Sequence, residues 1–191
     1  MMTQSLYLIR HAQPEPDATA PASEWRLSHE GRRATVALAA GLQDAGITRL
    51  VASFEPKAVE TARLLAAELG IPSAIAAGLH EHDRSNVGFL PAQERLEELI
   101  KELFDKPEER VFGKETANEA RFRFQAAVER LLEANPGETL GVVSHGTVIS
   151  LLVSAANGFD GYAYWKSMGM PDVLKVSLPG FRLEEHKNHA A

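Results

Sequence analysis

The stretch Leu6-Tyr7-Leu8-Ile9-Arg10-His11 is an apolar run that ends in an arginine and a histidine. A second apolar run with a histidine at its end, Leu140-Gly141-Val142-Val143-Ser144-His145-Gly146, occurs far downstream. Short apolar runs predict buried strands, and each histidine then stands where its strand gives way to a loop or helix. In open α/β sheets ligands bind outside the carboxyl ends of the strands, so both imidazoles are expected at one crevice. Two histidines and an arginine there suit phosphoryl chemistry, because one imidazole can attack phosphorus while cations neutralise its oxygens.

Strand-like and helix-like segments alternate around these two runs. Further strands are predicted at 50–52, 71–76 and 174–178, and helices at 28–45, 56–69, 92–104, 115–133 and 145–156. The stretch 78–91 is irregular and rich in titratable groups, which favours an active-site loop. A loop is predicted at 157–171, and the polar tail from Glu184 is expected to fray. The alternation predicts an α/β three-layer sandwich with a mostly parallel central sheet flanked by helices, with residues 1–191 forming a single domain.

The composition narrows the class of protein. Of the 191 residues, 20 are basic and 26 acidic, and no cluster of lysine and arginine stands out, so nucleic acid is not an expected partner. The chain has no cysteine, which excludes disulfides, a thiolate nucleophile and cysteine-based metal sites. No apolar run approaches the ~20 residues of a membrane span, and the start lacks the features of a signal peptide. We therefore expect a cytoplasmic protein that does not contact membranes.

Several motifs follow one another in a recognisable order. They are Arg10-His11 within residues 8–14, the stretch 53–62, Leu79-His80-Glu81, Gly113-Lys114-Glu115-Thr116, and Ser144-His145-Gly146. This ordered set resembles the histidine phosphatase superfamily, which includes the cofactor-dependent phosphoglycerate mutases. The resemblance spans nearly the whole chain. It implies a phosphomonoester phosphatase that works through a phosphohistidine and requires neither a metal nor an organic cofactor.

The resemblance also implies a role for each site residue. His11 would be the nucleophile, with its other ring nitrogen held by a neighbouring backbone carbonyl, and Arg10 would grip two phosphate oxygens. His145 would act as a cation that stabilises charge on the transferring group. Glu81 would protonate the leaving alkoxide and then take a proton from water. For that first step its environment is expected to raise the pKa of Glu81, through burial or through the charge of the phosphate.

The sequence departs from the family pattern at the second phosphate-binding arginine. Lys57 stands there, and a lysine keeps the positive charge but loses the bidentate geometry of a guanidinium. Arg84, three residues beyond Glu81, is the better candidate for the missing guanidinium.

Other functions remain open at this stage. One alternative is phosphoryl transfer of the phosphoglycerate mutase type. Another is a phospho-ligand binding module without turnover, which the lysine at position 57 suggests. A third is a metal-dependent hydrolase that uses the cluster from His80 to Asp83, although no third ligand at a recognisable spacing is evident. The expected partner is a small phosphorylated substrate or a phosphoprotein. The sequence does not determine the oligomeric state.

Overall fold

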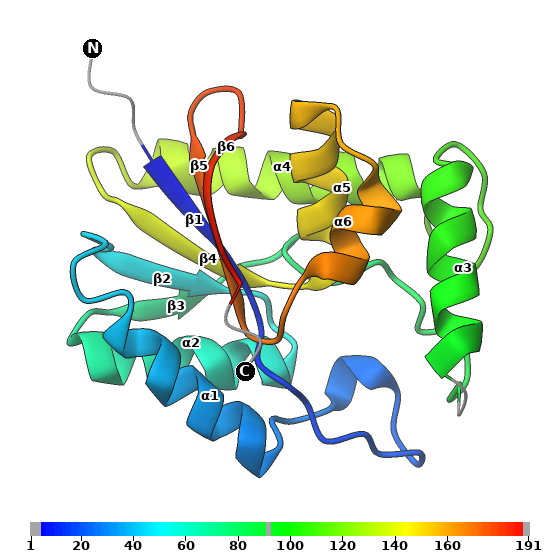
Figure 1. Ribbon diagram of the computed structural model, residues 1–191, viewed down its shortest axis with the longest axis horizontal. Helices are drawn as coiled ribbons and strands as arrows, with labels where there is room; N and C mark the ends of the chain where they lie inside the picture. Colours follow the sequence, from blue (N-terminus) through cyan, green and yellow to red (C-terminus); the bar gives the residue numbers. More distant parts are fainter. Residues whose placement is uncertain (1–4, 91–92, 189–191) are drawn as a thin grey trace.

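The computed structural model describes residues 5–90 and 93–188, which build a six-stranded sheet in the order β3-β2-β4-β1-β5-β6 (Figure 1). The strands are β1 (Ser5–Arg10), β2 (Arg49–Ala52), β3 (Ser73–Ile75), β4 (Leu140–Ser144), β5 (Asp172–Ser177) and β6 (Arg182–Asn188). The pairs β1–β4, β2–β4 and β2–β3 are parallel, whereas β5 and β6 add an antiparallel edge. The predicted α/β fold class with a mostly parallel central sheet is confirmed.

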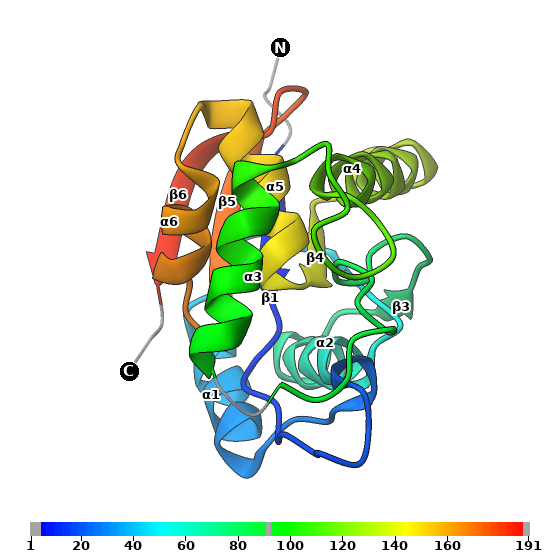
Figure 2. The ribbon, with the colours of Figure 1, turned by 90° about the vertical axis from the view of Figure 1, so that its right-hand side faces the viewer.

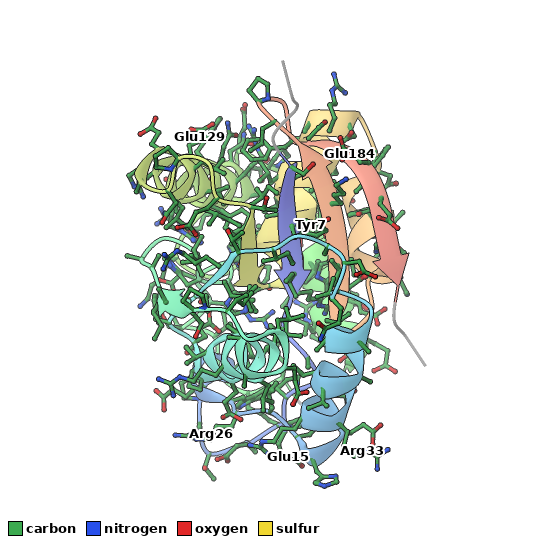
Figure 3. The ribbon with its side chains drawn as sticks, turned by 90° about the vertical axis from the view of Figure 1, so that its left-hand side faces the viewer. Tyr7, Glu15, Arg26, Arg33, Glu129 and Glu184 are labelled. Atoms are coloured by element: carbon green, nitrogen blue, oxygen red, sulfur yellow. The ribbon has the colours of Figure 1, made fainter. Side chains whose placement is uncertain are left out.

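Helices cover both faces of this sheet. They are η1 (Ala22–Glu24, a 3-10 turn), α1 (His29–Ala40), α2 (Pro56–Leu69), α3 (Gln93–Asp105), α4 (Ala117–Ala134), α5 (Gly146–Asn157) and α6 (Gly161–Ser167). Figure 3 shows the layers from one end, with Tyr7 on the sheet, Arg33 on α1 and Glu129 on α4. Figure 2 shows α3, α5 and α6 together, with α1 and α2 apart from them. The predicted layered arrangement is therefore present.

Alternating side chains on each strand supply the two cores. On β1, Leu6 and Leu8 belong to the core that packs with α3, α4 and α5, whereas Tyr7 and Ile9 belong to the core that packs with α1 and α2. Successive side chains of a strand point to opposite faces, so an unbroken apolar run suits a strand buried on both sides. The apolar character of β1 is thus a consequence of its place between two helical layers.

Local signals set the ends of the helices beside the site. The Ser28 side chain accepts a hydrogen bond from the Gly31 N–H, and this N-cap starts α1. Pro56 occupies the first turn of α2, and Gly70 ends that helix in the left-handed conformation at φ 67°. The Thr116 side chain and Glu119 form a reciprocal capping box that starts α4. These starts agree with the predicted positions to within a few residues.

Three expectations about the elements were wrong. Helix α1 ends at Ala40, not near 45, because Gly41 is a poor helix former and the chain continues in turns. The stretch predicted as a loop at 157–171 contains α6, whose N-cap is the Asp160 side chain bonded to the Ala163 N–H. The tail from Glu184 does not fray over its described length but belongs to β6, where charged residues are tolerated because an edge strand has one open side. The predicted boundary at Pro91 and Ala92 lies outside the described residues.

The strand register brings the ends of both decisive runs together. Arg10 on β1 lies opposite Ser144 on β4, and the His11 N–H donates to the Ser144 carbonyl oxygen at 2.9 Å. On the other side of β4, the Ser53 N–H donates to the Val143 carbonyl oxygen at 3.0 Å. His11, Ser53 and His145 therefore leave the sheet at the same edge, beyond the carboxyl ends of β1, β2 and β4.

Candidate active site

The two histidines that end the apolar runs lie against each other. The ring centroids of His11 and His145 are 5.2 Å apart, with the ring planes at 63°. This proximity across 134 residues of chain results from the parallel pairing of β1 with β4. The predicted convergence of the two imidazoles is present.

A backbone hydrogen bond orients His11. Its Nδ1 lies 2.7 Å from the carbonyl oxygen of Ala12, so Nδ1 carries the proton and the lone pair resides on Nε2. The Ala12 N–H in turn donates to Thr61 Oγ1 on α2 at 3.1 Å, which fixes the backbone after β1. Burial, followed by the neighbouring His145 and Lys57, lowers the pKa of His11 well below its ordinary value. His11 is therefore an uncharged imidazole with an available lone pair.

His145 differs from the expected cation across the crevice. Its side chain is 0 % exposed and lies behind His11, with Nε2 2.9 Å from Ser53 Oγ and 3.4 Å from Glu55 Oε1. Burial and, next, the charge of Lys57 lower the pKa of His145 well below its ordinary value, although Glu81 opposes this shift. The reason is physical: an imidazolium taken out of water loses its hydration. Burial therefore disfavours the imidazolium that was expected at this position.

Arg10 is held at the same edge by the backbone. Its Nη1 donates to the carbonyl oxygens of Met168 at 2.9 Å and of Gly169 at 3.3 Å, while its Nε is buried without a protein partner. Gly146, the first residue of α5, makes room for this guanidinium, because a methyl group there would lie 2.9 Å from the Arg10 Nε. A side chain after His145 would therefore displace the Arg10 guanidinium from its present position.

Lys57 lies at the site but is engaged by a carboxylate. Its Nζ donates to Glu55 Oε2 and to the Ala22 carbonyl oxygen, both at 2.6 Å, and its side chain is buried together with that of Glu55. Glu55 Oε1 also accepts the Glu81 N–H at 2.9 Å. Sequence reasoning did not single out Glu55. The available signal was an acidic residue two positions before the lysine, at the start of the predicted helix.

Glu81 lies at the N-terminus of α5. Its carboxylate accepts hydrogen bonds from the backbone N–H groups of His82 at 2.8 Å, Thr147 at 3.1 Å and Val148 at 3.3 Å. Burial by itself raises the pKa of Glu81, but the His145 ring, the Arg84 guanidinium and these N–H donors outweigh it, so the pKa lies below the ordinary value. Burial thus acts in the expected direction, and the charges of His145 and Arg84 are the largest effects that oppose it.

The loop that carries Glu81 is fixed by a residue that sequence reasoning missed. Arg123 on α4 donates to the carbonyl oxygens of Gly78 and His80, both at 2.9 Å, and of Glu81 at 3.1 Å. Glu115 pairs with the same guanidinium and accepts the Asp83 N–H at 2.9 Å. Since the chain from Gly78 to Asp83 has no regular structure of its own, these bonds determine where Glu81 stands.

A cavity of about 490 Å³ opens at this edge of the sheet. His11, Arg10, Lys57, Glu81 and Arg84 line it, together with Gly146 and Thr147 that follow the buried His145. The segment after β1 and the segment between β3 and α3 form much of its wall (Figures 1 and 2). Sequence reasoning thus named residues that the fold does bring together.

The cluster from His80 to Asp83 does not gather around one point. The His82 ring contacts Phe112 and places Nε2 2.8 Å from the Glu115 carbonyl oxygen, whereas Asp83 accepts from the Ser85 N–H and hydroxyl. Within residues 5–90 and 93–188, no group of three or more histidine and carboxylate side chains is arranged to hold a metal ion. In the same ranges, no helix combines the length and the apolar character needed to span a bilayer.

Several solved structures share this fold. The phosphoserine phosphatase of Entamoeba histolytica in complex with 3-phosphoglyceric acid superposes with a TM-score of 0.78 at 16 % identity, covering 98 % of this chain and 100 % of that chain. A mycobacterial glucosyl-3-phosphoglycerate phosphatase gives a TM-score of 0.75 at 19 % identity, covering 97 % and 99 % of the two chains. At these identities the likeness concerns the fold.

Comparison of sequences identifies the family. A probable phosphoglycerate mutase, GpmB, from Cronobacter sakazakii is 27 % identical over 167 residues, which is 83 % of this chain and 77 % of that protein. The family model described as histidine phosphatase superfamily (branch 1) matches residues 6–186. This range includes both histidines, Lys57 and Glu81. The chain therefore belongs to the histidine phosphatase superfamily.

Proposed function

We propose that this protein is a phosphomonoester phosphatase that acts through a phosphohistidine on His11, without a metal ion. The observation that supports this best is the state of His11. Its Nδ1 is fixed on the Ala12 carbonyl oxygen, its ring is uncharged, and its side chain lines a cavity that Arg10 and Glu81 also line. A neutral, oriented imidazole beside a guanidinium is suited to attack a phosphoryl group.

The reaction proceeds in two steps. In the first, His11 Nε2 forms a bond to phosphorus, the bond from phosphorus to the ester oxygen breaks, and protonated Glu81 gives its proton to the leaving alkoxide. In the second, Glu81 takes a proton from water, the oxygen of that water bonds to phosphorus, and the P–N bond breaks. Inorganic phosphate leaves, and His11 and Glu81 return to their starting states.

Bound phosphate changes the protonation of Glu81 and His145. Glu81 is ionised without ligand, and a dianionic phosphoryl group next to it disfavours a second anion, which raises the pKa of Glu81. The same negative charge favours protonation of His145, whose Nδ1 is buried without a protein partner. In the complex with substrate, Glu81 is therefore a proton donor and His145 is a cation.

Arg10 and Arg84 are the proposed phosphate-binding cations, with Lys57 as the third. Both arginines line the cavity, and Arg84 lies close enough to influence the pKa of Glu81 and of His145. Lys57 contributes less than an unpaired lysine would, since Glu55 competes for its ammonium group. Guanidinium groups bind phosphate oxygens in pairs, which a lysine cannot do.

Replacing Glu55 by glutamine is expected to strengthen the binding of vanadate or inorganic phosphate by about tenfold, because the cavity loses one negative charge and Lys57 becomes available. Isothermal titration calorimetry measures the dissociation constant. Glu60→Gln is the matched control, since Glu60 on α2 pairs with Arg26 and Arg32 outside the cavity. Unchanged or weaker binding in Glu55→Gln would mean that Lys57 does not reach the phosphate.

Treatment with EDTA is expected to leave hydrolysis of p-nitrophenyl phosphate within about twofold of the untreated rate, since the proposed steps use a nitrogen nucleophile and a carboxyl proton donor. Release of p-nitrophenol before and after dialysis against the chelator gives the comparison. Loss of activity that zinc or manganese restores would instead support the metal-dependent hydrolase.

Mutase activity is the second candidate, favoured by the relative described as a probable phosphoglycerate mutase. ³¹P NMR of 3-phosphoglycerate incubated with the enzyme separates the two functions. Inorganic phosphate as the main product supports the phosphatase, and an isomeric phosphoglycerate supports the mutase.

The cavity of about 490 Å³ has the size typical of sites for small ligands, which favours a small ester over a phosphoprotein as the substrate.

A further inference from the structure

The outer wall of the cavity is largely apolar. It is formed by side chains from separate segments of the chain, among them Trp25, Phe54, Phe89, Leu90, Trp165 and Met170. Phe54 is 55 % exposed, Phe89 46 % and Met170 36 %, so three of the exposed large apolar side chains of the described residues line this one cavity. Apolar groups gathered at a concave surface mark a site where an apolar ligand removes them from water.

Trp25 is a rigid part of this wall. Its Nε1 donates to the carbonyl oxygens of Asp17 at 3.0 Å and of Ala20 at 3.1 Å, so the polar edge of the indole is already satisfied. The centroid of the Trp25 ring lies 6.3 Å from that of the Phe89 ring. The two rings come from segments that are far apart in the sequence. An indole held in this way presents an apolar face without the entropic cost of ordering it on binding.

The charges of the cavity are balanced before any ligand binds. Among the described residues that line it, the cations are Arg10, Lys57 and Arg84, and the carboxylates are Glu55, Glu81 and Asp83. Lys57 is already paired with Glu55, and the remaining cations are those assigned above to the phosphoryl group. A second anionic group on a substrate would therefore meet apolar side chains without a cation, and an unpaired charge in such surroundings is costly.

Building on the proposed phosphatase activity, we propose that the preferred substrates are monoesters of phosphate with an apolar alkyl or aryl alcohol, and that esters carrying a second anion, such as 3-phosphoglycerate, are poor substrates. The phosphoryl group lies at His11 and the apolar group lies against Trp25 and Phe89.

A homologous series of n-alkyl phosphates from ethyl to octyl tests this preference, with release of inorganic phosphate as the measurement. We expect kcat/KM to rise about two- to fourfold per added methylene until the cavity is filled, since each buried methylene contributes a transfer free energy of that size. Hexyl and phenyl phosphate should exceed 3-phosphoglycerate by about tenfold or more. A flat series, or 3-phosphoglycerate at or above hexyl phosphate, would overturn the proposal.

Variants of the wall provide the matched comparison. Trp25→Ala and Phe89→Ala are expected to lower kcat/KM for octyl phosphate by about tenfold and to leave ethyl phosphate within about twofold. Phe122→Ala removes an equally exposed phenylalanine, 57 % exposed on α4 and outside the cavity, and should leave the whole series unchanged. If the wall variants lower the rates for ethyl and octyl phosphate equally, the wall does not bind the alcohol.

Binding of alkylphosphonates separates this proposal from the catalytic one, because phosphonates are not hydrolysed. Calorimetry should show octylphosphonate binding about tenfold or more tighter than ethylphosphonate, with the difference reduced about tenfold in Trp25→Ala. This result would support the apolar site even if no ester were turned over, in which case the proposed phosphatase activity alone would fail. Equal affinity for the two phosphonates would reject the apolar site whatever the activity.

Discussion

Replacement of His11 by alanine is expected to lower kcat for phosphomonoester hydrolysis by about 10⁴-fold or more, because it removes the proposed nucleophile. The Ala12 carbonyl oxygen fixes the tautomer of His11, and the lowered pKa of His11 favours its neutral ring. Hydrolysis of p-nitrophenyl phosphate, followed by release of nitrophenol, measures the loss.

The phosphohistidine itself provides a second measurement. Wild-type protein quenched with base during turnover of a labelled ester should retain label that acid then releases, and His11→Ala should retain none. His29→Ala is the control, since His29 is an exposed histidine at the start of α1. Vanadate binding by His11→Ala would show that the fold and the Arg10 site persist. Hydrolysis by His11→Ala within about tenfold of wild type would exclude the phosphohistidine pathway.

Replacement of Glu81 by glutamine is expected to have an effect that depends on the leaving group. For alkyl phosphates, whose alkoxide needs a proton, kcat should fall by about 10²- to 10⁴-fold, the usual contribution of a general acid. For p-nitrophenyl phosphate, whose phenolate leaves without a proton, the first step should continue while the second lacks its base. Rapid mixing should then show a burst of nitrophenol equal to the enzyme concentration, followed by a slow phase.

The pH dependence gives an independent readout of the same group. Because the bound phosphate raises the pKa of Glu81, wild-type kcat for an alkyl ester should fall as the pH rises through that pKa, and Glu81→Gln should lose this limb. Glu98→Gln is the matched control, as Glu98 is an exposed residue of α3 paired with Arg95. Equal losses for alkyl and nitrophenyl esters, with no burst and an unchanged pH limb, would assign Glu81 a purely structural role.

The fold was largely predictable because its signals are local. The apolar runs before His11 and His145 became β1 and β4, and the caps at Ser28, Pro56 and Gly70 became helix ends. One failure concerned a segment whose own residues carry no strand signal. The polar stretch at Arg182–Asn188 is a strand only because β5 offers it an edge with which to pair.

The charges of the site show the same division. From the sequence alone, the two histidines were expected at one edge of the sheet. The candidate site residues were Arg10, His11, Lys57, Glu81, Arg84 and His145. The sequence could not reveal what opposes the effect of burial on the pKa of Glu81, because His145 and the Thr147 N–H group, which lower that pKa, lie more than 60 positions away. It could not reveal that Glu55 forms an ion pair with Lys57. Residues two positions apart pair in this way only when both side chains turn into the same buried space.

By itself, then, the sequence determined most of the strands and helices, though not α6 or β6, and which residue types meet at the ends of β1 and β4. Only the tertiary structure decided the pKa shifts of His145 and Glu81, the pairing of Lys57, the fixing of the Glu81 loop by Arg123, and the apolar wall built from Trp25 and Phe89. The physical reason is that backbone conformation responds to near neighbours along the chain, whereas burial and electrostatic interactions depend on every group that folding brings within a few ångströms.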